Sequence, residues 1–275
     1  MTTSRLKAEH SQESPALELH SLSLRFDGHN ALLDLTLSLE SGLHVAVVGP
    51  NGAGKSTLFN ILAGLLTPST GSVSIHGHPP AQHMCLAYVT QSSQVDWTFP
   101  VSVEEVVMMG RVGLIGLFKQ PSRKDWSFVG GCLERVQLRN LAHRQISQLS
   151  GGQKQRMFIA RALAQEADMF LLDEPLAGLD IPSQEQILKI LDDLKQLGIT
   201  VMFATHDLDL AAKFDRVLLL NRKLIAFGGK DEVLTPKNLS QAYGGTMQVV
   251  ETAEGPIMLG DSGGHHGHEP EGRHG

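Results

Sequence analysis

The chain has 275 residues, of which 41% are hydrophobic and 19% are charged, and its formal net charge is -6 at pH 7. This length suits one large domain or two small ones, and this composition is that of an ordinary globular protein with room for a core. The negative charge disfavours a nucleic-acid partner, because nucleic-acid phosphates attract a basic surface.

The termini, the cysteines and the hydropathy bear on membrane insertion, secretion and the redox compartment of the protein. No apolar run reaches the about 20 residues of a membrane-spanning helix, and residues 1–14 are too polar for a signal peptide and predict disorder. Cys85 and Cys132 lack the neighbours of a metal site, which indicates two unpaired thiols in a reducing compartment. If the protein acts at a membrane, it must bind a separate membrane subunit.

Alternating leucines predict two half-buried antiparallel strands early in the chain. The first covers residues 17–26, a turn follows at Asp27-Gly28, and the second contains Leu35, Leu37 and Leu39. Phe26 lies at the end of the first strand, facing the turn. Its position is equally compatible with stacking on a nucleotide base and with a place in the core.

The next stretch matches the phosphate-binding pattern G-x-x-x-x-G-K-[ST]. A buried strand at 44–48 precedes it and a helix follows, which disfavours the alternative of a glycine-rich turn with a chance lysine. Backbone N–H groups and the helix N-terminus attract an anion, Lys55 brings a charge to the phosphates, and Ser56 offers a hydroxyl to Mg²⁺. The expected nucleotide-binding residues are Gly49, Pro50, Asn51, Gly52, Ala53, Gly54, Lys55, Ser56 and Thr57.

Strands are expected at 72–75 and 86–89. His76 and His78 lie between them, but nothing nearby completes a metal site, so a surface turn is the better interpretation. Gln91 follows the second of these strands at its carboxyl end, where open α/β sheets bind ligands.

Residues 92–144 differ in their sequence pattern from the segments around them, which indicates a mostly helical insert. Helices are expected at 103–109 and 128–136, with a loop at 110–116. The apolar residues around 114–118 are candidates for a partner surface.

After this insert, an amphipathic helix that runs to about Ala164 begins at Leu149-Ser150-Gly151-Gly152-Gln153. Ser150 is an ordinary N-cap on its own evidence, although two glycines behind it also suit an anion.

Two carboxylates end the next buried strand. Asp173 and Glu174 follow the apolar run 169–172, and after a phosphate-binding loop such a pair favours a cation site over two solvated acids. Asp173 is placed for Mg²⁺, and Glu174, one residue on, for poising a water molecule.

Another helix and another buried strand are expected after these carboxylates. A tight loop at 177–180 precedes a helix from near Pro182 to Gly198, and the buried strand 200–204 leads to His206, which favours a phosphate contact. A hairpin is expected at 216–227. The tail 260–275, with four histidines, predicts disorder and weak metal affinity.

Five of these elements occur in one order: the phosphate-binding loop, Gln91, Leu149–Gln153, Leu171–Glu174 and His206. That set resembles the ABC ATPases, whose signature is L-S-G-G-Q. The resemblance covers residues 17 to about 235. It implies an α/β P-loop NTPase fold with a RecA-like core, an N-terminal antiparallel β subdomain and a helical signature subdomain.

The resemblance also implies roles for single residues. Phe26 corresponds to the adenine-stacking aromatic, which is usually a tyrosine; Gln91 to the residue that contacts Mg²⁺ and the membrane partner; Asp180 to the D-loop aspartate; and His206 to the switch histidine on the γ-phosphate. With Lys55 and Glu174, His206 is expected to be catalytic. ATP and Mg²⁺ are the expected cofactors, and two ATP molecules lie between the P-loop and the opposing signature in a head-to-tail homodimer.

The expected domain organisation is a disordered segment 1–14, an ATPase domain at 15–245 with its helical subdomain at about 92–165, and a C-terminal extension at 246–275. Within the insert, the run from Gln94 to Val103, then Met109-Gly110-Arg111 and Pro121-Ser122-Arg123, resembles the ATP-binding subunits of manganese and zinc importers. Iron importers are close relatives of these and remain an alternative.

This resemblance implies a peripheral subunit on the cytoplasmic face of the membrane, partnered by a permease and indirectly by a metal-binding solute-binding protein. The alternatives are a non-transport ABC protein and an ATP-sensing module without turnover. The single cassette and the lack of a heptad array or basic bias disfavour the first, and intact Asp173, Glu174 and His206 disfavour the second.

Overall fold

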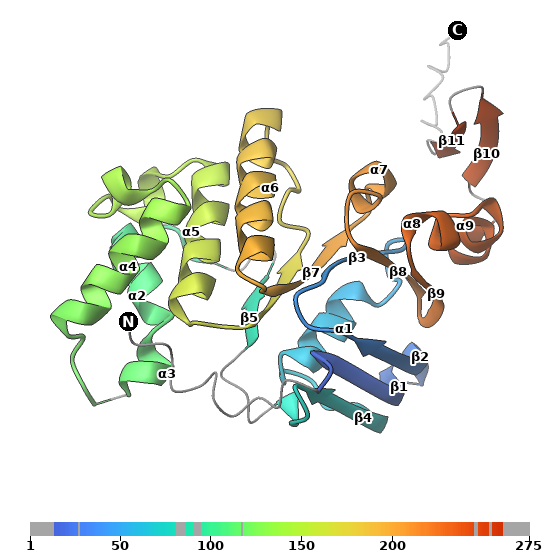
Figure 1. Ribbon diagram of the computed structural model, residues 1–275, viewed down its shortest axis with the longest axis horizontal. Coiled ribbons are helices and arrows are strands. Elements are labelled where there is room, and N and C mark those ends of the chain that lie inside the picture. The colour runs from blue at the N-terminus through green and yellow to red at the C-terminus, as the bar shows by residue number, and fades with distance from the viewer. Residues whose placement is uncertain are drawn as a thin grey trace, which may run out of the picture.

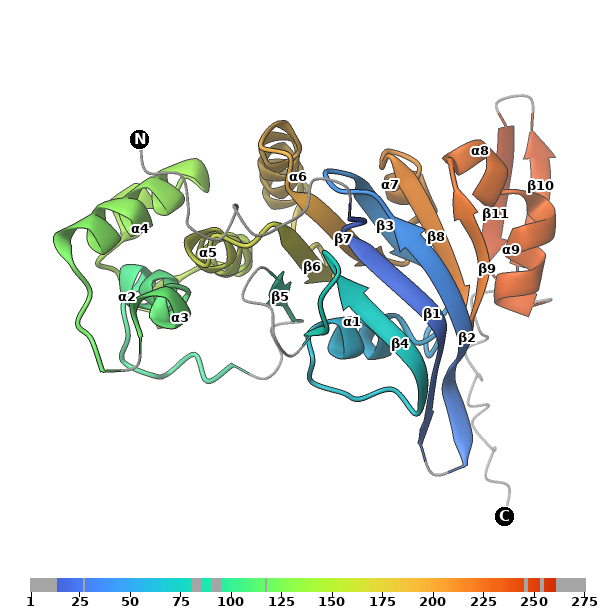
Figure 2. The same ribbon diagram turned by 60° about the horizontal axis from the view of Figure 1, so that its bottom comes forward.

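The computed structural model describes residues 14–26, 28–80, 86–90, 95–116, 118–244, 247–252 and 255–260. A group of helices lies at one side of the molecule, and an antiparallel sheet lies toward the other, with a mainly parallel sheet between them (Figures 1 and 2). None of the helices in this described part is long and apolar enough to cross a bilayer.

The antiparallel sheet contains β1 (Leu17–Phe26), β2 (His29–Leu39) and β4 (Thr70–Ile75) in the order β2-β1-β4. The leucines that alternate along β1 and β2 are the buried ones, and they join the core beneath the sheet. The two strands predicted from this alternation are therefore confirmed, and so is the strand predicted at 72–75, which begins two residues earlier.

The central sheet has the order β5-β6-β7-β3-β8-β9, in which β5 to β8 are parallel and β9 pairs antiparallel with β8. Every residue of β3, β6 and β7 is buried, as expected for parallel strands covered on both faces. The strands are β3 (His44–Val48), β5 (Leu86–Val89), β6 (Met169–Asp173), β7 (Thr200–Thr205), β8 (Arg216–Asn221) and β9 (Lys223–Gly228).

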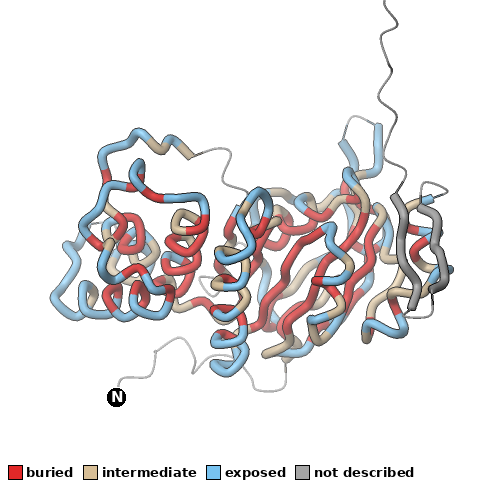
Figure 3. Tube along the Cα trace, turned by 90° about the horizontal axis from the view of Figure 1, so that it is seen from above, coloured by how far each residue is buried: buried red, intermediate tan, exposed pale blue. Residues whose placement is uncertain are grey.

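Two cores cover the two faces of this sheet, because side chains alternate along β6. Met169 and Leu171 pack with α1 (Lys55–Leu62) and the antiparallel sheet. Phe170 and Leu172 pack on the other face with α5 (Gly151–Ala164) and α6 (Ile181–Gln196). The strands and the inward sides of the helices are accordingly the buried parts of the chain in Figure 3. The short helices α7 (Leu208–Ala211), α8 (Lys230–Val233) and α9 (Pro236–Tyr243) cover β3 and β8.

The helical group contains α2 (Val103–Met109), α3 (Val112–Ile115) and α4 (Arg123–Arg135), two 3₁₀ turns at Arg139–Leu141 and Ile146–Gln148, and the start of α5. The helix predicted at 103–109 is confirmed with the same ends. The helix predicted at 128–136 begins earlier, because Ser122 and Asp125 form a capping box at its start. The loop predicted at 110–116 is wrong in part, since it contains α3.

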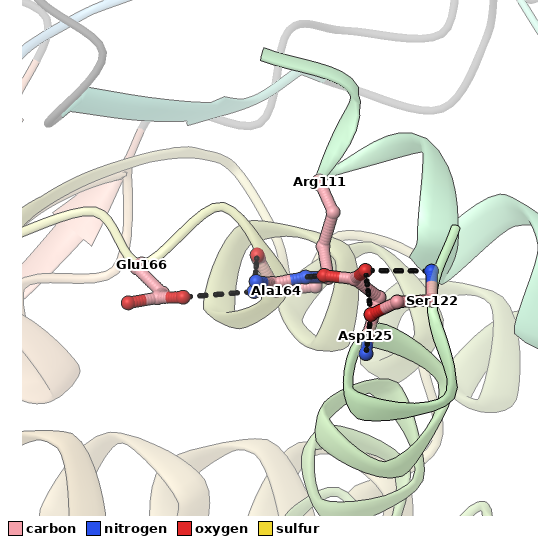
Figure 4. A network of polar contacts seen from close by, with 5 residues as sticks. All are labelled: Arg111, Ser122, Asp125, Ala164 and Glu166. Atoms are coloured by element: carbon pink, nitrogen blue, oxygen red, sulfur yellow. Dashed lines mark hydrogen bonds and ion pairs between the residues drawn. The ribbon is translucent and has the colours of Figure 1, made fainter. Parts of the chain in front are cut away.

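Arg111 fixes this region (Figure 4). Its Nε lies 2.9 Å from Asp125 Oδ1 on α4, and its Nη1 lies 2.8 Å from Glu166 Oε1 and donates to Ala164 O at the end of α5. The guanidinium also stacks over Phe128, 4.4 Å from the ring centroid. These contacts join three helices and hold the backbone before α3 in place, which explains why a glycine-rich stretch forms a helical turn there.

Two further expectations need correction. His76 and His78 do lie at a turn, but His76 is buried, and its backbone N–H donates to Ala16 O at 3.2 Å. The strands β10 (Met247–Thr252) and β11 (Gly255–Gly260) pair antiparallel with each other, where no strands were predicted. Residues 1–13, Cys85 and the tail 261–275 lie outside the described residues. Cys132 is free and buried, as predicted.

Candidate nucleotide-binding site

The phosphate-binding loop connects β3 to α1, and two of its glycines are required by close backbone contacts. A Cβ on Gly49 would lie 2.0 Å from Leu220 O. Gly54 caps α1 with φ 97°, and a Cβ there would lie 2.8 Å from Ala31 O. Ala53 O accepts a bond from Arg222 N at 2.8 Å. The loop is thus held between β2 and the β8–β9 turn, and backbone N–H groups in a loop of this kind attract an anion.

This loop lines a cavity of about 350 Å³. Within it, Lys55 Nζ donates to Gly49 O at 2.8 Å and to Pro50 O at 3.3 Å. Burial lowers the pKa of Lys55, while the nearby carboxylates of Glu174 and Asp173 oppose that change. The lining residues are Ala31, Asn51, Gly52, Ala53, Gly54, Lys55, Ser56, Thr57, Asp173 and Glu174. The structure therefore brings the predicted loop and both predicted carboxylates to one cavity.

A larger cavity, of about 630 Å³, lies between α4 and the ends of α5 and α6. Phe128, Cys132, Leu163 and Leu197 are among its lining residues, and neither the phosphate-binding loop nor the paired carboxylates reach it. Size alone would favour that cavity, but the phosphate-binding chemistry belongs to the smaller one.

Asp173 ends β6 and is buried. Burial raises the pKa of its carboxyl group, and hydrogen bonds from Ser56 and Tyr88 oppose that rise. The hydroxyl of Ser56 and the carboxylate of Asp173 are the hard oxygen donors that Mg²⁺ takes together with substrate phosphates, so these residues fit that ion. In the part of the chain that the structure describes, no group of three or more His, Cys, Asp or Glu side chains could hold a metal by itself.

Glu174 is placed differently from its neighbour. Its φ is 48°, a left-handed conformation that is uncommon for a residue with a side chain, and its N–H bonds Ala204 O at 3.2 Å. Its Oε1 lies 4.0 Å from Nδ1 of His206, just beyond β7. The two residues share a second cavity, of about 220 Å³, that adjoins the first at Glu174. The backbone turn after Asp173 thus brings the second carboxylate toward His206.

The predicted signature segment lies outside the P-loop cavity of its own chain. Ser150 caps α5, accepting from Gln153 N at 3.3 Å while its own N–H bonds Gln153 Oε1. Ser150 and Gly151 are exposed, whereas a Cβ on Gly152 would lie 2.4 Å from Ser183 Oγ. The cap predicted from sequence is confirmed, and the exposed start of α5 remains available to another molecule.

The remaining predicted site residues are scattered. Asp180 caps α6 by accepting from Ser183 N, and hydrogen bonds from the hydroxyl and the backbone N–H of Ser183 lower the pKa of its carboxyl group. Phe26 is 45% exposed and does not line the P-loop cavity, where Ala31 lies instead. Gln91 lies outside the described residues. One residue without a predicted role reaches the site: Tyr88 Oη donates to Asp173 Oδ2 at 3.3 Å.

Three curated relatives are similar along most of their length. The manganese transport system ATP-binding protein MntB of Bacillus subtilis is 43% identical over 86% of this chain and 95% of its own. YfeB of Yersinia pestis, of a chelated iron transport system, is 42% identical over 86% and 81%. The zinc transport system ATP-binding protein TroB of Treponema pallidum is 40% identical over 86% and 90%.

The fold of this chain is also similar to that of solved ABC transporter structures. An ABC transporter described as metal-chelate type, in an inward-facing conformation, has a TM-score of 0.75 at 31% identity, over 89% of this chain and 96% of that one. A dimeric ATP-binding cassette bound to ADP and phosphate after hydrolysis has a TM-score of 0.68 at 26% identity, over 78% and 98%. The family model for ABC transporters matches residues 32–177. The chain therefore belongs to the ABC transporter family, in which it is an ATP-hydrolysing, ATP-binding subunit.

Proposed function

We propose that this ATPase energises the import of a transition metal ion, manganese or zinc, through a separate membrane permease. The observation that carries the proposal is the identity of 40% or more to MntB and TroB over nearly their whole length. Iron or an iron chelate is the second candidate cargo, because YfeB is as similar as these relatives.

Chemistry at the P-loop cavity follows from the residues that line it. Lys55 and the loop N–H groups bind the β- and γ-phosphates of ATP, and Ser56 and Asp173 hold Mg²⁺, with Gln91 as a further contact. When bound, Mg²⁺ neutralises charge on the phosphate oxygens. Glu174 polarises the attacking water, and His206, which lies beside it, contacts the γ-phosphate.

The second half of the site comes from another copy of the chain. In this homodimer, the exposed start of α5 with Leu149, Ser150, Gly151, Gly152 and Gln153 covers the ATP bound to the opposing P-loop. The absence of these residues from the P-loop cavity of their own chain supports this arrangement, as does the likeness to a dimeric cassette. Asp180 lies near the same signature helix, because Ser183, its capping partner, packs against Gly152.

The helical group provides the surface for the permease. Met109, Val112, Phe118 and Trp126 are exposed apolar side chains on or beside α2, α3 and α4, and Phe118 is fully exposed. Such a cluster is typical of an interaction surface. We place the subunit at the cytoplasmic face of the membrane, with a solute-binding protein delivering the metal to the permease and no nucleic acid involved.

Transport by the reconstituted complex tests this function. The chain would be purified with its permease, incorporated in liposomes with ATP on the side of the ATPase, and supplied with the metal-loaded solute-binding protein on the other side. The expected result is ATP-dependent uptake of Mn²⁺ or Zn²⁺ that stops with Glu174→Gln. ATP-dependent uptake of an iron chelate alone would identify the second candidate. A non-transport role would give ATP hydrolysis without uptake of any of these metals.

A further inference from the structure

We propose that Tyr88 is a positioning residue for the hydrolysis reaction, whose hydroxyl holds the Asp173 carboxylate in the orientation that receives Mg²⁺. The inference deepens the proposed function, since it rests on the assignment of Mg²⁺ to Ser56 and Asp173. Its basis is the hydrogen bond from Tyr88 Oη to Asp173 Oδ2, at 3.3 Å.

Sheet register brings the two side chains together. Strands β5 and β6 are parallel, and Tyr88 is the Cα partner of Leu171. Leu171 and Asp173 are two residues apart, so their side chains lie on the same face of the sheet as Tyr88. This is the face that α1 covers, with Lys55 and Ser56 at the start of that helix. Tyr88 thus approaches the P-loop cavity from the strand next to β6.

The tyrosine ring is fixed by packing. Phe59 of α1 meets it edge to face, with ring centroids 6.2 Å apart and planes at 89°. Because α1 also carries Lys55 and Ser56, the helix that presents the phosphate-binding lysine holds the ring that bonds the Mg²⁺ carboxylate. The hydroxyl position is therefore set by the same elements that form the site.

The hydroxyl is the donor in this bond, because an ionised carboxylate can only accept. Asp173 accepts from both Ser56 and Tyr88. Since Ser56 is itself expected to turn its oxygen to Mg²⁺, the bond from Tyr88 is the one that continues to orient the carboxylate when the ion is bound. Outer partners of this kind commonly set the affinity of a metal site.

The test uses Tyr88→Phe, which removes the hydroxyl and keeps the ring that packs on Phe59. Its matched control is Tyr243→Phe, the same change at the other tyrosine of the chain, which ends α9 and packs in a different core. Binding of a fluorescent ATP analogue would be measured without turnover, in a Glu174→Gln background, first in EDTA and then across a Mg²⁺ titration.

We expect the affinity in EDTA to be unchanged and the half-saturating Mg²⁺ concentration to rise about tenfold in Tyr88→Phe, the lower end of the effects seen for outer partners of metal ligands. Tyr243→Phe is expected to titrate like the parent. In the chain with Glu174 restored, the KM for Mg²⁺ would rise while kcat at saturating Mg²⁺ stays close to its original value. A Mg²⁺ titration in Tyr88→Phe equal to the parent's would overturn the proposal and leave Tyr88 a packing residue.

A double-mutant cycle with Asp173→Asn separates positioning from stability. If Tyr88 acts through Asp173, its removal changes nothing further in the Mg²⁺ titration of the Asp173→Asn chain. An equal loss in both backgrounds would instead indicate general destabilisation and contradict the proposal. Failure of the proposed Mg²⁺ site is distinguishable from either result, because Asp173→Asn alone would then titrate like the parent.

Discussion

At the scale of single residues, the site depends on what the backbone does immediately after a buried strand. Asp173 continues the strand and faces the phosphate-binding loop, whereas the left-handed φ of 48° at Glu174 turns the next carboxylate toward His206. Two adjacent acids therefore have two environments. In the proposed mechanism, this separation lets Asp173 meet a cation and Glu174 poise a water.

Replacing Glu174 by Gln tests the second role. The amide keeps the size of the side chain but cannot accept a proton from the water, so kcat should fall about 10²- to 10⁴-fold. Equilibrium binding of ATP should be unchanged, because the phosphate contacts come from the loop. Glu185→Gln, an exposed acid on α6, is the matched control. Phosphate release at the parental rate from the Glu174→Gln protein would show that another group activates the water.

His44 provides a separate test at the same scale, of stability against pH. The imidazole is buried at the start of β3, and burial lowers its pKa below the ordinary 6.5. The unfolded chain therefore binds more protons than the folded chain as the pH falls through 6.5, and folding stability must fall with it. Above that pH both states hold the neutral ring, and this contribution to stability is fully present.

Thermal unfolding checks this sign. The Tm should drop as the pH is lowered from 7.5 to about 5.5, and the drop should be smaller in His44→Leu, which has no proton to bind. His20→Gln, at an exposed position of β1, should keep the parental slope. A steeper drop in His44→Leu than in the parent would reverse the assignment.

At the scale of elements, the sequence predicts those whose patterns are local. Ser150 was predicted as an N-cap, and in the structure both Ser150 and Ser102 form capping boxes at the first turn of a helix. The helix α3 was missed because it is only one turn long, contains a glycine and is held by Arg111 contacts from distant parts of the chain. Its stability is tertiary in origin, and no local pattern encodes it.

Arg111→Ala measures how much that network contributes. The guanidinium is 12% exposed and its partners are mostly covered, so the substitution leaves two carboxylates and a carbonyl without their donor. We expect a loss of about 2–3 kcal/mol in the free energy of unfolding. Denaturant titration gives this value, with the exposed Arg123→Ala as control, expected within about 0.5 kcal/mol of the parent. An equal, small loss in both variants would mean that the contacts in Figure 4 are not needed to hold the helices together.

Tyr88 illustrates the limit of sequence reasoning about the site. The strand that carries it was predicted, but a role for its hydroxyl depends on pairing with β6, which lies 80 residues further along the chain by number (169 minus 89). The available signal was an aromatic hydroxyl on the strand before Gln91, on the alternation that faces α1. Recognising the role of this hydroxyl requires the order of strands in the sheet, which composition and periodicity do not give.

At the scale of the whole molecule, motif order predicted the family and the fold, because each motif is tied to one place in the sheet. The pairing of β10 with β11 was not foreseen, since these strands form a two-stranded sheet of their own among the described residues and their sequence lies beyond the motifs. No single element or sequence motif determines how two copies of the chain pack together. The proposed arrangement of two copies rests on the likeness to a dimeric cassette, and the absence of the signature from the P-loop cavity of the same chain supports it.

Crosslinking tests this composite site most directly. Asn51→Cys and Ser150→Cys would be combined with Glu174→Gln in a chain whose Cys85 and Cys132 are replaced by alanine. With ATP and Mg²⁺ bound, a short thiol crosslinker should join Asn51→Cys of one copy to Ser150→Cys of another, giving a covalent dimer that does not form in EDTA without nucleotide. Crosslinks confined to single chains, or a dimer yield independent of ATP, would contradict a site shared between two copies.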